Sequence, residues 1–208
     1  QVLCHYFNEL SFLSCTKINL LNYNSVLYFK EYGRGMLSTV AFRGTTASQT
    51  AVIWNGININ SQMNGSTDFN TISGTDYNSI AVKGGGGSVI YGSGAIGGTV
   101  HLNNDLRFER SFSNQLRLDY GSFNTQGIHY SSQFSNTKWS AQIGFSRNYS
   151  DNDYDYPGLF DWKGNQRFNE NGEYEVIGFN AVIGFKISDK QILKAYSQSS
   201  NTDRNISL

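Results

Sequence analysis

The chain has 208 residues, and its 16 Lys and Arg residues balance 16 Asp and Glu residues, so the formal net charge is zero. This balance gives no reason to expect nucleic acid as a partner, and no apolar run approaches the ~20 residues of a membrane-spanning helix. The chain has 22 glycines, 13 tyrosines and 14 phenylalanines, but one proline and 15% charged residues. This composition indicates many β-strands joined by tight turns.

The first 25 residues carry a helical pattern and two cysteines. Four apolar residues at helical spacing would share one face: Leu10, Leu13, Ile18 and Leu21. The segment from Gln1 to Cys15 has no basic region and no small-residue cleavage site, so it does not resemble a signal peptide. We therefore interpret the chain as a fragment of a longer product. Cys4 and Cys15 lack metal-type neighbours, and we interpret them as incidental.

Residues 26–104 are short apolar runs punctuated by glycine. Residues 88–102 predict a short strand, a glycine-dense elbow and a second strand. Residues 92–97 formally match the dinucleotide motif G-x-G-x-x-G, but β-branched residues follow where that motif needs a helix. The context excludes nucleotide binding. Asn55-Gly56, between two β-rich runs, predicts a type I′ hairpin turn.

Beyond residue 105 the pattern changes to alternation of apolar and polar residues. Four segments alternate clearly, at 115–120, 128–134, 139–146 and 177–186, and the faces of a fifth, 192–198, cannot be assigned. Such segments are typical of transmembrane β-barrels, although a soluble β-sandwich shows the same alternation. Two details favour the barrel. The polar positions hold glycine, serine and glutamine, as a wet lumen permits, and short connections alternate with one long connection at 149–174.

Five segments resemble the plug domain of TonB-dependent outer-membrane receptors, in the family's order. The matches are STVAFRGTTAS at 38–48, VIWNGININ at 52–60, DFNTI at 68–72, IAVKGG at 80–85 and YGSGAIGGTVHL at 91–102. They are similar to the family's IRGTxAS, VLIDGVxLN, DLNxIP, IEVLRGP and YGSxAIGGxVxI segments. The RGTTAS form leans toward the cobalamin-receptor branch.

The resemblance implies a mainly β fold in two parts. Residues 1–104 would form a partial plug domain of short strands with a few short helices. Residues 105–208 would form about the first five antiparallel strands of an incomplete transmembrane β-barrel. Plugged transporters use about 22 strands, so five cannot close a barrel. An open edge in lipid would also leave backbone groups unsatisfied.

The resemblance also implies a function: energy-coupled uptake of a large scarce nutrient across the bacterial outer membrane, with cobalamin favoured over an iron-siderophore. The implied partners are the nutrient, outer-membrane lipid and the TonB complex, although no TonB box is recognisable in this chain. A second interpretation is a soluble or surface-exposed β-rich adhesion or binding module with degenerate plug motifs. A third, a passive porin, has no use for a plug.

Site residues follow from the resemblance, position by position. The implied ligand contacts are Leu37, Thr39, Thr46, Asn64 and Gly65, for which ordinary loop surface is the alternative. A buried guanidinium must find carboxylates or carbonyls. We accordingly expect Arg43 and Lys83 to tie the plug to acidic residues of the barrel wall rather than to contact ligand.

A calcium site is the one metal site that the sequence suggests, and no cofactor is required. Asp151, Asp153 and Asp155 alternate in the long connection, and carboxylate oxygens suit Ca²⁺. Calcium orders outer loops in cobalamin receptors, as the resemblance implies. The spacing is not that of an EF-hand, and a solvated acidic loop is the alternative. Glu170 and Glu173 would join the site only if the loop folds back.

We expect no enzymatic activity, because no catalytic constellation is visible. His5, His101 and His129 lie far apart in the sequence, and His101 and His129 sit in strand patterns that favour a structural role. Neither a nucleophile elbow nor a Walker motif is present.

Overall fold

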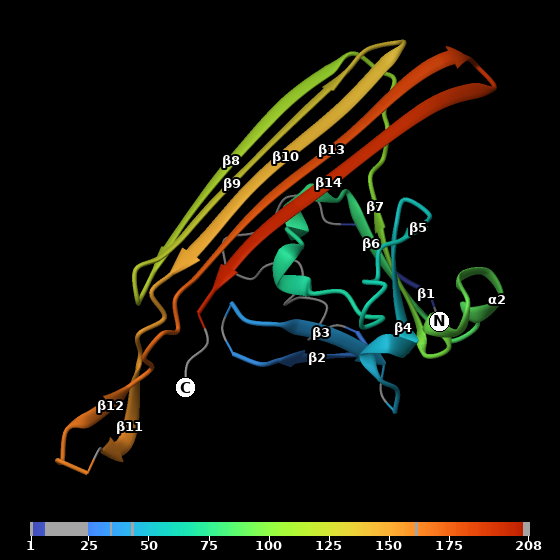
Figure 1. Ribbon diagram of the computed structural model, residues 1–208. Coiled ribbons are helices and arrows are strands. Elements are labelled where there is room, and N and C mark those ends of the chain that lie inside the picture. The colour runs from blue at the N-terminus through green and yellow to red at the C-terminus, as the bar shows by residue number, and fades with distance from the viewer. Residues whose placement is uncertain (1, 7–24, 34, 43, 161, 206–208) are drawn as a thin grey trace.

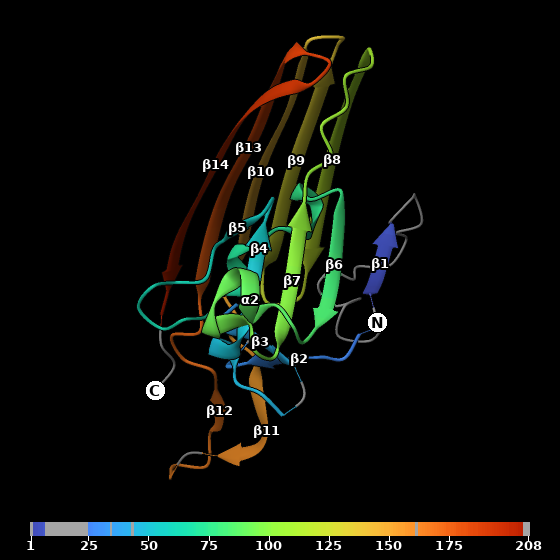
Figure 2. The same ribbon diagram turned by 90° about the vertical axis from the view of Figure 1, so that its right-hand side faces the viewer.

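The computed structural model describes residues 2–6, 25–33, 35–42, 44–160 and 162–205. The chain forms two parts, a compact N-terminal plug and a curved sheet of long strands, which we call the wall. Figure 1 shows the wall strands running past one side of the plug, and Figure 2 shows the plug lying against one face of the wall. The expected mainly β fold, with a plug followed by antiparallel strands, is confirmed.

The main plug sheet has five strands in the order β1-β6-β7-β4-β5. Their bounds are β1 Val2–Tyr6, β4 Thr50–Trp54, β5 Ile57–Asn58, β6 Ser79–Gly84 and β7 Gly98–Asn103. Strands β4 and β7 are parallel neighbours, and the other pairings are antiparallel. All five residues of β4 are buried, as expected of a central strand covered on both faces.

A separate hairpin of β2, Leu27–Glu31, and β3, Ser38–Phe42, packs against this sheet. Short helical turns connect the plug strands: η1 Ala47–Gln49, η2 Phe69–Thr71, η3 Gly74–Asp76, α2 Ser88–Tyr91 and η4 Ser93–Ala95. The plug core joins both sheets through apolar side chains. Its largest members include Phe42, Trp54, Phe69, Tyr77, Ile80 and Leu102.

Two local predictions had opposite outcomes. The hairpin turn is confirmed, since Asn55 and Gly56 both have positive φ, 48° and 93°, as a type I′ turn requires.

The strand expected at the start of residues 88–102 is wrong, because Ser88–Tyr91 form the single helical turn α2. Val89 and Ile90 are 91% and 76% exposed. Their β-branched side chains therefore have no sheet to join, and local hydrogen bonds to Gly87 and Ser88 decide the conformation. Strand β7 follows η4, so the dinucleotide interpretation fails as expected.

The wall is one antiparallel sheet in the order β14-β13-β10-β9-β8. Its strands are β8 Ser111–Gly121, β9 Thr125–Ser135, β10 Trp139–Ser150, β13 Tyr174–Ser188 and β14 Gln191–Arg204. The expected alternating segments lie in these strands, which are all longer than predicted. The register also assigns the faces of β14, which the sequence left open, because each residue shares the face of its partner on β13.

Strands β10 and β13 are mainly apolar on their outer face and mainly polar on the face that meets the plug, although Val176 and Val182 of β13 are buried on the plug side. The outward row of β14 is more polar and includes Ser197, Ser199, Asn201 and Asp203. On β10, Ile143 and Phe145 are 43% and 40% exposed, whereas Gln142 and Ser146 are buried at 7% and 4%. Strand β13 repeats the pattern with exposed Phe179 and Ile183, and with Asn180 on the plug face. A soluble sandwich would bury its apolar face between the sheets. This wall does the reverse, which favours the barrel interpretation over the sandwich.

The long connection contains a hairpin that the sequence did not predict. Strand β11, Asp155–Phe160, pairs with β12, Gln166–Phe168, and the hairpin projects from one end of the wall (Figure 1). Irregular register and exposed residues explain why no alternating pattern marks it. The helical pattern at 10–21 and Cys15 lie outside the described residues. No helix within the described ranges is long and apolar enough to cross a membrane.

Candidate ligand site and plug–wall interface

Three of the five predicted ligand residues lie together on the plug. Thr46 caps the start of η1, and its Oγ1 lies 3.0 Å from Oγ of Ser48. Gly65 reaches the same place from the loop after β5, because a Cβ at Gly65 would lie only 3.2 Å from Cβ of Ser48. Asn64 adjoins Gly65 and is exposed. The fold thus brings Thr46, Asn64 and Gly65 into one surface.

Asn60 holds the loop that carries Asn64 and Gly65. Its Nδ2 donates to the carbonyl oxygens of Thr50 and Gly65, at 2.9 and 2.7 Å, while its Oδ1 accepts from the backbone N–H of Val52. The side chain of Asn60 therefore bonds backbone groups of β4 that β5, which ends at Asn58, is too short to pair. The loop is therefore fixed against β4 rather than free to sample many positions.

The other two predicted residues, Leu37 and Thr39, lie on the β2–β3 hairpin. Leu37 is 36% exposed, but Thr39 is only 8% exposed and has little surface to offer a ligand. The turn before Leu37 is fixed at Gly35, where a Cβ would lie 2.2 Å from the ring of Tyr174 at the start of β13. Figure 1 shows β2 and β3 in the lower part of the plug, toward the end of the wall from which β11 and β12 project. Whether these residues bind ligand stays a prediction.

The structure adds three residues that sequence reasoning missed on the same face of the hairpin. Lys30 lies opposite Thr39 in the register, and Tyr28 lies opposite Ala41. Tyr28 and Tyr32 are 60% and 58% exposed, and Nζ of Lys30 lies 4.5 Å from the centroid of the Tyr32 ring. The alternation Tyr28-x-Lys30-x-Tyr32 could have identified this face.

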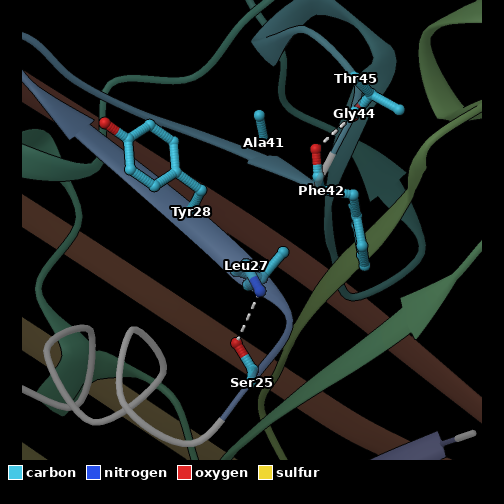
Figure 3. Close-up of a pocket in the computed structure, with 7 residues that line it drawn as sticks. All are labelled: Ser25, Leu27, Tyr28, Ala41, Phe42, Gly44 and Thr45. Atoms are coloured by element: carbon cyan, nitrogen blue, oxygen red, sulfur yellow. Dashed lines mark hydrogen bonds between the residues drawn. The ribbon is translucent and has the colours of Figure 1, made fainter.

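A depression of about 450 Å³ lies at the opposite end of the hairpin from Leu37 (Figure 3). It is lined by Ser25, Leu27, Tyr28, Ala41, Phe42, Gly44 and Thr45. Oγ of Ser25 accepts from the N–H of Leu27, and the Thr45 hydroxyl donates to the carbonyl of Phe42. These polar groups are therefore engaged locally, and the depression offers mainly the Tyr28 ring and apolar surface to a ligand.

The long connection does fold back on itself, which was the condition for Glu170 and Glu173 to join the acidic residues. Nδ2 of Asn169 donates to the carbonyl of Asn152 at 2.6 Å, and Nδ2 of Asn152 donates to that of Gly172 at 3.1 Å. Four carboxylates, those of Asp151, Asp153, Glu170 and Glu173, line one depression of about 650 Å³. Asp155 does not line it. No group of three or more metal-ligating side chains in the described ranges is close enough to hold an ion, so calcium stays a prediction.

The contact between plug and wall has polar and apolar parts, and Val182 of β13 belongs to the plug core. Near its centre, the Asp76 backbone carbonyl accepts from Asn104, and from Nε2 of Gln142 at 3.3 Å. The Asp76 side chain, which is 7% exposed, occupies the space over Gly144, where a Cβ would lie 2.5 Å from its Oδ1. A glycine on the wall is thus needed for the close approach of η3. Burial raises the pKa of the adjacent Tyr77, and the charge of Asp76 raises it further, so this phenol stays neutral.

Two further contacts join the plug to the wall. Oγ of Ser73 lies 3.4 Å from Nδ1 of His129, and the rings of Trp54 and Tyr196 meet edge to face with centroids 5.6 Å apart. His129 and His101 lie in strands, as expected. Arg43 lies outside the described residues. Lys83 is exposed on β6 and has no ion pair within the described part of the chain, so its expected link to the wall stays a prediction.

Comparison with known proteins supports the interpretation of the N-terminal part as a plug domain. Residues 18–99 match the family model of the TonB-dependent receptor plug domain. The vitamin B12 transporter BtuB of Vibrio vulnificus is 32% identical over 120 residues, which are 57% of this chain and 19% of that protein. BtuB of Vibrio cholerae is 35% identical over 78 residues, 38% of this chain and 13% of that protein. These matches show that residues 18–99 are similar to the plug domain of TonB-dependent receptors.

Two solved structures show the same fold. The copper transporter OprC superposes with a TM-score of 0.74 at 16% identity, over 98% of this chain and 30% of that chain. The siderophore receptor PirA from Acinetobacter baumannii superposes with a TM-score of 0.64 at 16% identity, over 99% of this chain and 32% of that chain. At such identities the superpositions establish the TonB-dependent receptor fold alone. The chain spans about a fifth or less of the length of the curated relatives given above.

Proposed function

We propose that this chain forms the plug and about the first five wall strands of a bacterial outer-membrane receptor for energy-coupled uptake of a large scarce nutrient. The observation that carries the proposal is the arrangement of wall strands β10 and β13, whose apolar side chains point outward while most of their polar side chains face the plug. A sheet of this kind suits lipid on one side and a filled lumen on the other. A passive porin would leave the lumen open.

The height of the apolar face supports a membrane location. Along β10 the outward side chains run from Trp139 to Tyr149, ten residue steps and about 34 Å of strand, and the row is apolar from Trp139 to Phe145. A strand tilted by about 45° would convert this length to about 24 Å, close to the ~25 Å apolar band of outer-membrane barrels. Aromatic residues stand at both ends of the outward row, as they do in the girdles of such barrels. The outward Arg147–Glu175 ion pair lies near the Tyr149 end.

Cobalamin is the ligand that we favour, with an iron-siderophore second. The support is the identity of the curated relatives, which are vitamin B12 transporters, and the RGTTAS segment at 43–48. The structural neighbours transport copper or bind siderophores by their names, and they do not discriminate. In the receptor, ligand would bind at the outer end of the plug, and the TonB complex would act from the periplasmic side. Such coupling requires that ligand bind two plug states with different affinity.

The ligand site is tested by binding to the complete natural protein. We expect Leu37→Ala and Asn64→Ala each to weaken cobalamin binding about tenfold, the loss of one well-packed contact. Met63→Ala is the matched control, because Met63 is 99% exposed in the same loop as Asn64 and belongs to neither predicted contact. Equilibrium binding of labelled cobalamin measures the affinity. Unchanged affinity in both variants would remove the site from these loops, and saturable ferric-siderophore binding in its place would change the ligand.

We also propose that Ca²⁺ binds in the depression lined by Asp151, Asp153, Glu170 and Glu173. Carboxylates that line one depression repel one another, and a hard cation that drew them together would relieve that repulsion. Terbium luminescence, displaced by Ca²⁺, measures binding directly. We expect Asp151→Asn to weaken binding at least tenfold and Asp155→Asn, outside the depression, to leave it unchanged. Equal affinity in all three proteins would exclude this site.

A further inference from the structure

One carboxylate joins three parts of the molecule that lie far apart in the sequence. Oδ1 of Asp68 accepts from the backbone N–H groups of Ser38 and Asn70, each at 3.0 Å. Oδ2 of the same side chain lies 2.7 Å from Nη1 of Arg204 at the end of β14. The contact to Ser38 reaches strand β3, which we call the ligand strand because the predicted contacts Leu37 and Thr39 lie at its start. The contact to Asn70 reaches η2, and the contact to Arg204 reaches the wall.

Both ends of this connection are held by further contacts. Ser38 lies between Leu37 and Thr39 and is only 2% exposed. The side chain of Asn70 also donates to the carbonyl of Met36, so η2 holds the β2–β3 turn at two points. On the wall side, Arg204 lies opposite Tyr174 in the register, and the Tyr174 ring packs against Gly35 in that turn. A displacement of the ligand strand must therefore reach the Asp68–Arg204 ion pair.

The ion pair is shielded from water but incompletely satisfied. The side chains of Asp68 and Arg204 are 17% and 18% exposed. Nε and Nη2 of Arg204 are buried and have no hydrogen-bond partner among the described residues. A guanidinium in this state has lost hydration that its single partner does not replace. The pair consequently holds the plug less firmly than a fully bonded bidentate pair, which suits a contact that breaks and reforms.

We propose that Asp68 is a positioning residue that latches the ligand strand of the plug to wall strand β14, and that ligand binding loosens or tightens this latch. The proposal rests on the proposed receptor function and names its first step of signal transmission. The latch is specific to Asp68 because one oxygen fixes the strand while the other meets the wall. An asparagine at this position would keep an oxygen for the two backbone N–H groups and lose the charge.

The test uses the complete protein in outer-membrane vesicles, with Cys4 and Cys15 replaced by serine and Ser146→Cys as the single reporter cysteine. Ser146 lies on the plug face of β10 and is 4% exposed, so a maleimide reaches a cysteine there only when the plug moves away. We expect Asp68→Asn and Arg204→Gln to raise the labelling rate about tenfold without ligand, and the double variant to add no more. Removing the Lys186–Asp189 pair, at the opposite end of the wall, is the control and should change nothing.

Cobalamin is then added at saturation. In the protein with an intact ion pair we expect the labelling rate to change at least threefold, and in Asp68→Asn we expect no change although ligand still binds. Unaltered labelling in Asp68→Asn and Arg204→Gln, or the same response to ligand with and without the pair, would overturn the latch. Heat-modifiable gel mobility verifies folding of each variant, and Asp68→Asn is used because Asp68→Ala also removes the backbone contacts. If no variant binds cobalamin, the ligand assignment fails while the ligand-free labelling still decides whether the latch exists.

Discussion

The plug and the wall use the same amino acids in opposite ways. In the plug, apolar side chains such as Val100 and Leu102 are fully buried between the sheets. In the wall, Phe145 and Phe179 point outward, and Gln142 and Asn180 take the buried side. The difference follows from what each region has for a neighbour. The plug packs its apolar side chains against one another, as a water-soluble domain does. The outward apolar side chains of the wall are the pattern that transmembrane β-barrels show where lipid covers them.

The largest expected difference comes from one substitution made in both regions. Ile80 in the plug core is 1% exposed, and Ile80→Ala should lower the free energy of unfolding by about 2–5 kcal/mol through lost burial and a cavity. Ile143→Ala, on the outer face of the wall, should lower it by about 1 kcal/mol or less, because no protein cavity forms there. Urea unfolding in detergent measures both values. Equal losses would mean that the outer face packs against protein.

A charge should separate the two faces of one wall strand. Arginine near the middle of the lipid-facing band costs about 2–4 kcal/mol, so Ile143→Arg should destabilise the protein folded in lipid vesicles by that amount. Asn148→Arg, on the plug side of the same strand, is the control and should cost distinctly less. Folding titrations in lipid vesicles measure the free energy of folding of both variants. A larger loss for Asn148→Arg than for Ile143→Arg would contradict a lipid-facing outer side.

The interface between the two regions should be sensitive to one added methyl group. Gly144→Ala places a Cβ 2.5 Å from Oδ1 of Asp76, so η3 or the strand must shift. Overpacking of this kind costs about 1–3 kcal/mol. Gly121→Ala is the matched control, because its nearest contact would be 3.6 Å from Thr125. Thermal unfolding of both variants gives the difference, and a harmless Gly144→Ala would show that the plug does not seat at this point.

The smallest expected effect is a pH dependence in the plug. Burial lowers the pKa of His101, and the nearby charge of Lys83 lowers it further. As the pH falls below the ordinary histidine value of 6.5, the unfolded chain binds this proton first, so the free energy of unfolding decreases. Above that pH, His101 contributes no slope. The His101→Gln variant should have a flatter stability profile between pH 6.5 and the lowered folded value, as measured by thermal melts; an unchanged profile would assign the slope to other groups.

Residues with a strong local pattern were predictable from the sequence. The wall strands follow from alternation, and the Asn55-Gly56 turn follows from the residues that tolerate positive φ. The β11–β12 hairpin was not predictable because its residues are exposed and its register is irregular. Helix α2 was mistaken for a strand because β propensity at Val89 and Ile90 has no effect without a neighbouring strand.

The candidate site was predictable only in part. Thr46, Asn64 and Gly65 were found by resemblance, and the structure brings them together. Tyr28, Lys30 and Tyr32 were missed although their alternation places them on one face of a strand, and the register with β3 shows that this face is shared with Thr39. The Asp68–Arg204 pair joins residues 136 positions apart, and no local pattern encodes such a pairing. Long-range polar contacts of this kind depend on the tertiary fold.

The three tryptophans of the chain test the central claim directly, because Trp54 is buried in the plug, Trp139 is 48% exposed on the outer wall, and Trp162 is 89% exposed in the long connection. Each is retained in turn as the sole tryptophan of the complete protein in vesicles, and its fluorescence is quenched by brominated lipid and by aqueous iodide. Our account predicts that brominated lipid quenches Trp139 alone, that iodide quenches Trp162, and that Trp54 responds to neither. Quenching of Trp139 by iodide but not by brominated lipid would contradict a lipid-facing wall.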